Sequence, residues 1–239
     1  MNTNKNSYTL IYATIFVVVV AFLLAFISKA LEPQSQANER IDKKKQILAS
    51  LGKRDVKKED IEKIYAEFIV KDMIINAAGE VVNAGEEKDQ AGFLVSLADI
   101  SDECLPLYVC EVDGETKYVF PLSGRGLWGS IWGYVTLNSD LRTIYGAYFS
   151  HSSETAGLGA RITEEAFQTK FIGKKIADDE EPGISISVVK KVEDPSVQVQ
   201  AITGATLTSN GLDEMLRDGL EAYSVFLKLG TLNEVDGNE

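Results

Sequence analysis

The sequence is poor in the residues that build metal centres and disulfide frameworks. Its 239 residues include one histidine, His151, and two cysteines, Cys104 and Cys110. A structural zinc site takes about four such ligands, so this set is too small for one. If "CLPLYVC" is a single strand, the two cysteines lie roughly 20 Å apart, too far for a disulfide. We therefore expect two buried free thiols, and a solvated loop position for His151 rather than a role as metal ligand.

Signatures of common hydrolases and nucleotide-binding folds are also missing. The chain has no H-E-x-x-H, no G-x-S-x-G and no G-x-x-x-x-G-K, which are motifs of zinc proteases, of α/β-hydrolases and of phosphate-binding loops. It has five prolines and no internal repeat, which argues against a disordered or solenoid chain. Its 45% hydrophobic and 25% charged residues suit one globular domain with an added segment.

The added segment lies at the N-terminus. Residues 10–27, "LIYATIFVVVVAFLLAFI", contain no charge, proline or glycine, and as a helix they would span roughly 27 Å, enough to cross a bilayer. A secretory signal peptide is the alternative, but its apolar region is about 7 to 15 residues long and ends at a small-residue cleavage site. Lys29 stands in "ISKAL", without such a site. We therefore expect an uncleaved transmembrane anchor.

The charge distribution excludes some partners and leaves the orientation open. Residues 1–31 hold two of the 24 basic residues and none of the 36 acidic ones, so the rest of the chain carries a formal charge of −14. Such a surface repels nucleic acid and anionic lipid, and neither is expected as a partner. More lysines and arginines follow the apolar span than precede it. The positive-inside rule would place the C-terminal domain in the cytoplasm, but long domains follow this rule poorly.

After the anchor, the hydrophobic pattern first indicates helices and then strands. Residues 32–70 carry apolar residues at helical spacing, which predicts a juxtamembrane helical region. Two hairpins are expected beyond it, one turning at Asp113-Gly114 and one at residues 138–140. A short helix near residues 163–170, strands within 184–193 and 197–202, and an amphipathic last helix would complete the domain.

The expected fold class is therefore α+β, with mainly antiparallel strands. We divide the chain into a short tip with a transmembrane anchor (1–31), a juxtamembrane helical region (32–70) and one C-terminal domain (71–239).

Three segments rich in small and hydroxyl residues have no evident structural purpose. "AITGATLTSNGLDEML" (201–216) places four hydroxyl residues before or within the first turn of the last helix, and helix capping explains only one of them. "HSSETAGLGARI" (151–162) could let its backbone approach a flat or phosphorylated ligand, or it is a plain surface turn. In "SGRGLWGSIWGY" (123–134), Leu127 and Trp128 are expected in the core, or covering an aromatic ring of a cofactor.

In this order behind an N-terminal anchor, the three segments resemble the covalent FMN-binding domain family. That family includes the C subunit of the sodium-translocating NADH:quinone oxidoreductase and the G subunit of the Rnf electron-transfer complex. The matching stretches are Ser/Thr-Gly-Ala-Thr at 203–206, E-T-x-G-L-G at 154–159 and "GLW" at 126–128. "TLTSNG" and "DKKKQIL" favour the sodium-pump subunit. Gln200 departs from the family, which usually has an acidic residue at this position.

The resemblance implies a covalently bound FMN. A separate flavin transferase would join its phosphate to the Thr206 hydroxyl through a phosphodiester bond. Further residues implied to contact the cofactor are Thr203, Gly204, Ala205, Leu207, Thr208, Glu154, Thr155, Gly157, Leu158, Gly159, Leu127 and Trp128. The residue types fit, because Gly204 allows close backbone approach and a helix N-terminus favours a phosphate. Thr203, Thr208 or Ser209 would bond the phosphate oxygens or cap the helix.

The implied function is that of a membrane-anchored flavoprotein subunit that relays electrons within a sodium-translocating NADH:quinone oxidoreductase. The flavin would supply the redox chemistry, so neither catalytic residues nor a metal are expected in the chain itself. The implied partners are the other membrane, flavin and iron–sulfur subunits. The implied location is the bacterial inner membrane, with a periplasmic C-terminal domain. Two alternatives are an Rnf-type subunit and a non-redox anchored binding module in which "TGATLTS" is only a capped loop.

Overall fold

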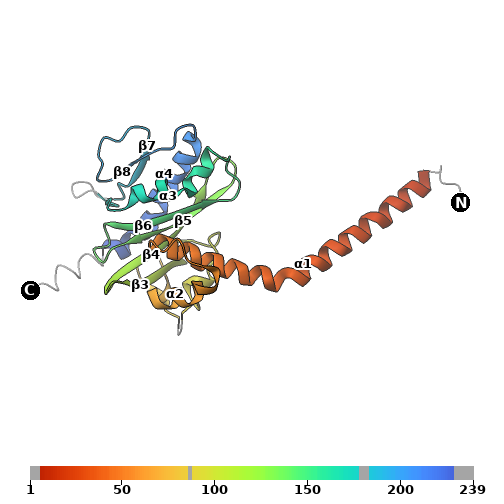
Figure 1. Cartoon of the computed structure of the whole chain (residues 1–239), viewed down its shortest axis with the longest axis horizontal. Coiled ribbons are helices and arrows are strands. Elements are labelled where there is room, and N and C mark those ends of the chain that lie inside the picture. The colour runs from red at the N-terminus through yellow and green to blue at the C-terminus, as the bar shows by residue number, and fades with distance from the viewer. Residues whose placement is uncertain (1–5, 86–87, 178–182, 229–239) are drawn as a thin grey trace, which may run out of the picture. The chain divides into compact units, whose positions relative to one another are not determined.

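The computed structural model describes residues 6–85, 88–177 and 183–228. Packing divides the chain into two compact units, Met1–Lys43 and Lys44–Glu239 (Figure 1). Helix α1 (Asn6–Ser50) contributes to both, and it continues through Pro33 without a break. The juxtamembrane region therefore begins as a continuation of the anchor helix, because residues 31–50 are rich in Lys, Gln, Ala and Leu, which favour helix.

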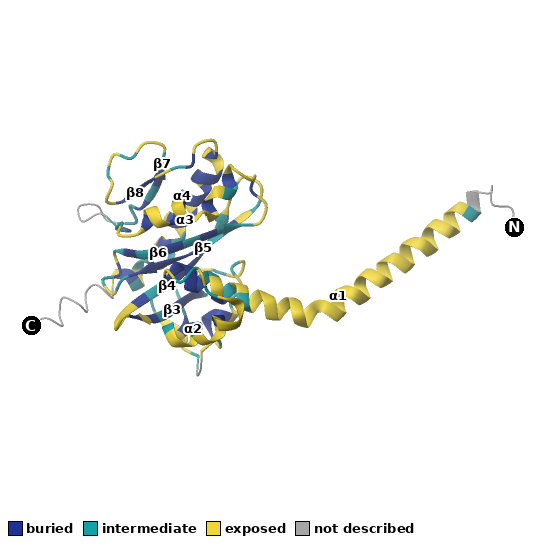
Figure 2. Cartoon of the chain, viewed as in Figure 1, coloured by how far each residue is buried: buried dark blue, intermediate teal, exposed yellow. Residues whose placement is uncertain are grey.

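The first unit contains the apolar part of α1 and the polar helical segment that follows it as far as Lys43. Residues 9–40 are all exposed (Figure 2). By length and composition α1 contains a candidate membrane span, and the apolar stretch of that span is not buried within the protein. A bilayer would remove this surface from water, which agrees with the expected anchor.

The second unit is built on a six-stranded sheet with the order β2-β1-β3-β4-β5-β6. Each neighbouring pair is antiparallel. The strands are β1 (Ile69–Ile75), β2 (Val81–Asn83), β3 (Leu105–Val112), β4 (Glu115–Arg125), β5 (Ser130–Leu137) and β6 (Ile144–His151). Both predicted hairpins are confirmed. Asp113 and Gly114 connect β3 to β4 with φ values of 53° and 81°, as a two-residue type I′ turn requires.

The helices and the remaining strands surround this sheet. They are η1 (Lys58–Asp60), α2 (Ile61–Phe68), η2 (Gly92–Leu94), η3 (Gly159–Thr163), α3 (Glu165–Gln168), η4 (Thr169–Phe171), β7 (Ser187–Val189), β8 (Gln198–Gln200) and α4 (Thr206–Ala222). The strands expected near 184–193 and 197–202 are shorter than expected, and they pair in parallel as a separate two-stranded sheet. The mixture of helices with a mainly antiparallel sheet confirms the α+β class.

Apolar side chains fill both faces of the large sheet. On one face, Phe120 and Leu122 of β4 pack with Leu216 and Leu220 of α4. The other face includes Tyr108 of β3 and packs against α2 and against the end of α1 with the residue that follows it. The apolar residues buried on these segments are Ile47, Leu48, Leu51, Ile61 and Tyr65. Figures 1 and 2 show α4 and α3 on one side of the sheet and α2 on the other. The expected region 32–70 thus contains the division between the two packed units, and α2 packs with the sheet.

Buried charge ties the end of α1 to this domain. The Lys44 ammonium is almost fully buried, pairs with Glu62 at 2.5 Å and Asp89 at 2.6 Å, and lies over the Tyr65 ring at 4.8 Å. A buried cation is tolerated only when it is paired in this way. The last turns of α1 are therefore part of the domain core.

The positions of the two cysteines and of the histidine agree only in part with those expected from the sequence. Neither cysteine forms a disulfide. Cys110 is buried on β3, and burial raises the pKa of its thiol, but Cys104 is only half-buried. His151 does not lie in a solvated loop: it ends β6, where it pairs with Ile131 of β5, and its Nδ1 accepts the Glu154 N–H at 3.2 Å.

Candidate functional site

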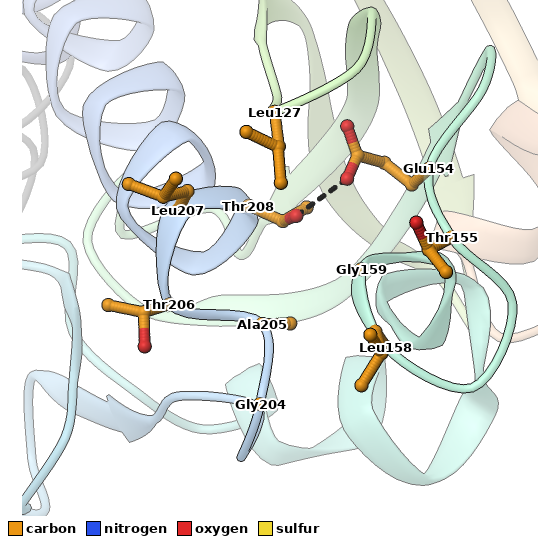
Figure 3. Close-up of a pocket in the computed structure, with 10 residues that line it drawn as sticks. All are labelled: Leu127, Glu154, Thr155, Leu158, Gly159, Gly204, Ala205, Thr206, Leu207 and Thr208. Atoms are coloured by element: carbon orange, nitrogen blue, oxygen red, sulfur yellow. Dashed lines mark hydrogen bonds between the residues drawn. The ribbon is translucent and has the colours of Figure 1, made fainter.

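The three segments singled out in the sequence meet at one open cavity of about 200 Å³ (Figure 3). It lies between the β4–β5 connection, the loop after β6 and the N-terminus of α4. Its lining consists of Leu127, Glu154, Thr155, Leu158, Gly159, Gly204, Ala205, Thr206, Leu207 and Thr208. A pocket that encloses a drug-sized ligand usually measures about 300 to 1,000 Å³. This cavity therefore suits one part of such a ligand, with the rest at the surface.

Every residue that lines the cavity was expected at the site from the sequence. Three other expected residues, Thr203, Gly157 and Trp128, do not line it. Gly157 instead supports the loop conformation with a φ of 75°, which favours glycine. Trp128 follows the lining residue Leu127 at the tip of the β4–β5 connection.

Glu154 joins the three segments through one side chain. Glu154 is buried, with only 7% of its surface exposed. Oε1 accepts the backbone N–H of Trp128 at 2.8 Å, and Oε2 accepts the hydroxyl of Thr208 at 2.6 Å. The bond to Thr208 is the dashed line in Figure 3. A single carboxylate thus connects the loop after β6 to both the β4–β5 connection and the first turn of α4.

Two glycines make room for this carboxylate. A Cβ atom at Gly126 would lie 2.5 Å from Oε1 of Glu154, and one at Gly159 would collide with Oε2 and with Oγ1 of Thr208. Any other residue at either position would have to displace the Glu154 side chain. Sequence reasoning did not assign Gly126 to the site, although it belongs to the quoted "GLW" stretch.

A third glycine lets helix α4 approach the sheet. A Cβ atom at Gly211 would collide with the carbonyl oxygen of Arg125, the last residue of β4. The sequence analysis did not assign a role to Gly211. A glycine inside an otherwise amphipathic helix was the pattern that could have indicated this close approach.

The N-terminus of α4 opens toward the cavity without a side-chain cap. The helix begins at Thr206, and its N-cap residue is Ala205, which makes no side-chain capping bond. The N–H groups of a first helical turn have no partner within the helix and attract anions. None of the clustered hydroxyl residues occupies the N-cap position, so capping does not explain the cluster.

The hydroxyl residues instead divide into exposed and buried ones. Thr203 and Thr206 are exposed, whereas Thr208 and Ser209 are buried. Ser209 Oγ accepts the N–H of Ile202 at 3.2 Å, and Thr208 donates to Glu154. Of the two α4 threonines that line the cavity, Thr206 is thus the one that presents an alcohol to solvent; Thr155, in the loop after β6, is also exposed. This arrangement can hold a phosphate group and offers an oxygen atom to which it could be bonded.

The rim of the cavity is apolar. Leu127, Leu158 and Leu207 are 46%, 43% and 59% exposed, and Trp128 is 65% exposed. The expectation that Leu127 and Trp128 belong to the core is therefore wrong. They lie at the tip of the turn between β4 and β5, which the Gly126 N–H closes by donating to the Gly129 carbonyl at 2.8 Å. Exposed leucines around a cavity can cover the face of a flat ring.

The described part of the chain contains no group of three or more His, Cys, Asp or Glu side chains arranged to hold a metal ion. The site is instead a cavity with an apolar rim, an anion-attracting helix end and a free alcohol.

The chain is similar to a known domain family and to several known proteins. Residues 126–221 match the model of the FMN-binding domain. The C subunit of the Na(+)-translocating NADH-quinone reductase of Neisseria meningitidis serogroup A is 31% identical, over 87% of this chain and 88% of the relative. The C subunit of the Pseudomonas aeruginosa enzyme is 26% identical, over 96% and 98%. The crystal structure of the C subunit of the Parabacteroides distasonis enzyme superimposes with a TM-score of 0.75 and 39% identity, over 82% of this chain and 96% of that one.

Proposed function

This chain belongs to the C-subunit family of the Na(+)-translocating NADH-quinone reductase, and from that premise we propose that it carries FMN covalently on Thr206. It is one subunit of a multisubunit oxidoreductase, and its FMN-binding domain makes it a flavoprotein. Within the complex this subunit relays electrons between neighbouring redox centres; bound FMN would supply the redox chemistry, and the chain would hold and orient it. The direct partners are the neighbouring redox subunits, and a flavin transferase attaches the cofactor.

The observation that carries this proposal is the position of Thr206. Its exposed side chain starts α4 at an uncapped helix N-terminus, inside the cavity that the three segments form. A phosphodiester bond needs an alcohol, and the phosphate gains from the N–H groups and the dipole of the helix. The exposed leucines of the rim would cover one face of the flavin ring. Thr208 supports this site indirectly, since its hydroxyl is bonded to Glu154.

The same proposal includes the membrane topology. Residues 1–31 form a cytoplasmic tip and the anchor, and the FMN-binding domain (71–239) lies on the periplasmic side of a bacterial inner membrane. Residues 1–5 and 229–239 lie outside the described residues. The apolar part of α1 supports the anchor. The excess of lysines after the span opposes this orientation only weakly, because positive charge has little effect on the translocation of long domains.

The covalent bond can be tested on the whole chain. Expressed together with a flavin transferase, the protein should give a yellow, fluorescent band that survives denaturing electrophoresis, because a phosphodiester bond persists when the fold is lost. A second culture without the transferase should give the same protein band without fluorescence. A colourless band in both cultures would contradict covalent attachment. It would favour the non-redox binding module.

A labelling experiment tests the orientation. In a Cys104→Ser background, Thr116→Cys places a thiol on the exposed surface of β4, and the buried Cys110 should stay unreactive because burial raises its thiol pKa. The cysteine at position 116 should react with an impermeant thiol reagent in intact spheroplasts, whereas Thr3→Cys should react only after lysis. The reverse pattern would place the domain in the cytoplasm.

The Rnf-type alternative is less well supported. The relatives reported above carry the name of the sodium-translocating enzyme. Purification of the intact complex separates the two, because the proposed function requires NADH:quinone reductase subunits to accompany this chain.

A further inference from the structure

We propose that Glu154 is a positioning residue, which holds the cavity in its working shape before the cofactor arrives. It acts through its hydrogen bonds to Trp128 and Thr208 and not by contact with the flavin. The site depends on the size of this side chain and on its capacity to form these two bonds, and not on its negative charge. The part of this inference that is tested by flavin incorporation rests on the proposed function. One of the measurements below is made on the protein without flavin and is independent of that function.

The first argument is that the Glu154 carboxylate is fully engaged by the protein. The residue is buried, and each of its two oxygens accepts a bond from a different segment. The partner Thr208 is itself buried. A carboxylate held in this way contributes to the wall of a cavity and has little surface left for binding a ligand.

The second argument is that Glu154 and its partners are held on several sides. The N–H of Glu154 donates to Nδ1 of His151 at 3.2 Å, so the backbone at this position is itself bonded. The peptide groups around Trp128 are held at two points, because its N–H donates to Glu154 and its carbonyl accepts the Ser153 hydroxyl at 2.9 Å. Removing the carboxylate would release one of these two points and the first turn of α4 together.

The third argument concerns distance along the chain. The two bonds of the carboxylate bridge 26 and 54 residues. Loops that are far apart in sequence have no local reason to share one geometry, so a cavity made from all three needs such a link. Gly126 and Gly159, which leave room for both oxygens, are part of the same arrangement.

The fourth argument separates shape from charge. Both donors to Glu154 are neutral, one a backbone N–H and the other a hydroxyl. Within the described ranges, no lysine, arginine or histidine forms an ion pair with Glu154. A glutamine has the same shape, and its amide can accept from Trp128 and donate to Thr208, because a hydroxyl can rotate to accept. Glu154→Gln should therefore preserve the link that Glu154→Ala destroys.

The experiment compares four variants of the full chain: Glu154→Gln, Glu154→Ala, Thr208→Ser and Thr208→Val. Each is incubated with flavin transferase and a flavin dinucleotide as donor, whose P–O–P bond breaks as the FMN phosphate is joined to the threonine oxygen and the nucleoside monophosphate leaves. The initial rate of covalent flavin incorporation is measured from band fluorescence and peptide mass. We expect Glu154→Ala and Thr208→Val to lower this rate by about tenfold or more, since each leaves buried groups unpaired. Glu154→Gln and Thr208→Ser should stay within about twofold of the wild type, because each keeps the bond. The double variant Glu154→Ala/Thr208→Val should be no slower than Glu154→Ala, because the link is already lost.

A second measurement uses protein made without flavin. The amide hydrogen of Trp128, on an exposed loop, should exchange slowly in the wild type and in Glu154→Gln, and about tenfold or more faster in Glu154→Ala. This comparison follows the hydrogen bond directly. It requires neither the transferase nor the cofactor.

Two results would overturn the inference. If Glu154→Gln incorporates flavin as poorly as Glu154→Ala, the negative charge is what the site needs. If Thr208→Val incorporates flavin normally while Glu154→Ala does not, Glu154 acts directly on the flavin or on the transferase. If the wild type accepts no flavin at all, the proposed function fails, and the exchange of the Trp128 amide still decides whether Glu154 holds the loops.

Discussion

Thr206→Ala is expected to give a folded, membrane-inserted chain that carries no covalent flavin. The change removes the alcohol to which the phosphate would be bonded, so incorporation should fall to background. The residue is exposed at the start of α4. The loss of its side chain should therefore change the free energy of unfolding by no more than about 0.5 kcal/mol, as is usual for surface positions.

A matched control is available three residues earlier. Thr203 is also an exposed threonine, but it does not line the cavity. Thr203→Ala should keep the flavin. Mass spectrometry of the peptide 201–216 decides the matter, because the wild type should carry an added FMN less one water on Thr206. A modification that persists in Thr206→Ala, or its loss in Thr203→Ala, would show that the attachment site is misassigned.

Gly159→Ala is expected to have the second largest effect, on stability and on flavin content together. The added Cβ would collide with Oε2 of Glu154 and Oγ1 of Thr208. These two atoms are bonded to each other and buried, so they cannot move apart without breaking that bond. A buried hydrogen bond lost in this way should lower the free energy of unfolding by about 1 to 3 kcal/mol. Covalent flavin should fall with it, because the cavity wall moves.

Gly157→Ala provides the contrast within the same loop. Nothing lies within 4 Å of a Cβ atom at this position, but its φ of +75° disfavours any other residue. We expect a backbone strain of about 1 kcal/mol with flavin content and absorbance close to the wild type. Denaturant unfolding and the flavin spectrum measure the two effects separately. Equal loss of flavin in both variants would show that loop flexibility, not the contact at Glu154, controls the site.

Local patterns explain why parts of the fold could be predicted. The β3–β4 hairpin depends on Asp113 and Gly114, whose conformations are decided by two adjacent residues. The apolar span of residues 10–27 needs only its own composition to be recognised. The parallel pairing of β7 with β8 was not predicted, because it depends on the path of the chain between them and not on either strand.

The candidate site divides in the same way. The residues that line the cavity were found from three short motifs, each readable within a dozen residues. The sequence left two positions open for Leu127 and Trp128, the core or the edge of a cofactor ring, because large apolar side chains are usually buried and only the tertiary structure shows that these two are exposed. The roles of Gly126 and Gly211 depend on atoms of Glu154 and Arg125, which are distant in sequence.

By itself, the sequence determined the anchor, the α+β class, the family and the threonine proposed to hold the flavin, since each follows from composition or from contiguous residues. Only the tertiary structure decided which hydroxyl is free and which is engaged. Thr206 and Thr208 are two residues apart and of the same type, yet one faces solvent and the other donates to Glu154. Their orientation on α4 is set by how the helix packs on the sheet, and that packing is a sum of long-range contacts that no local pattern contains.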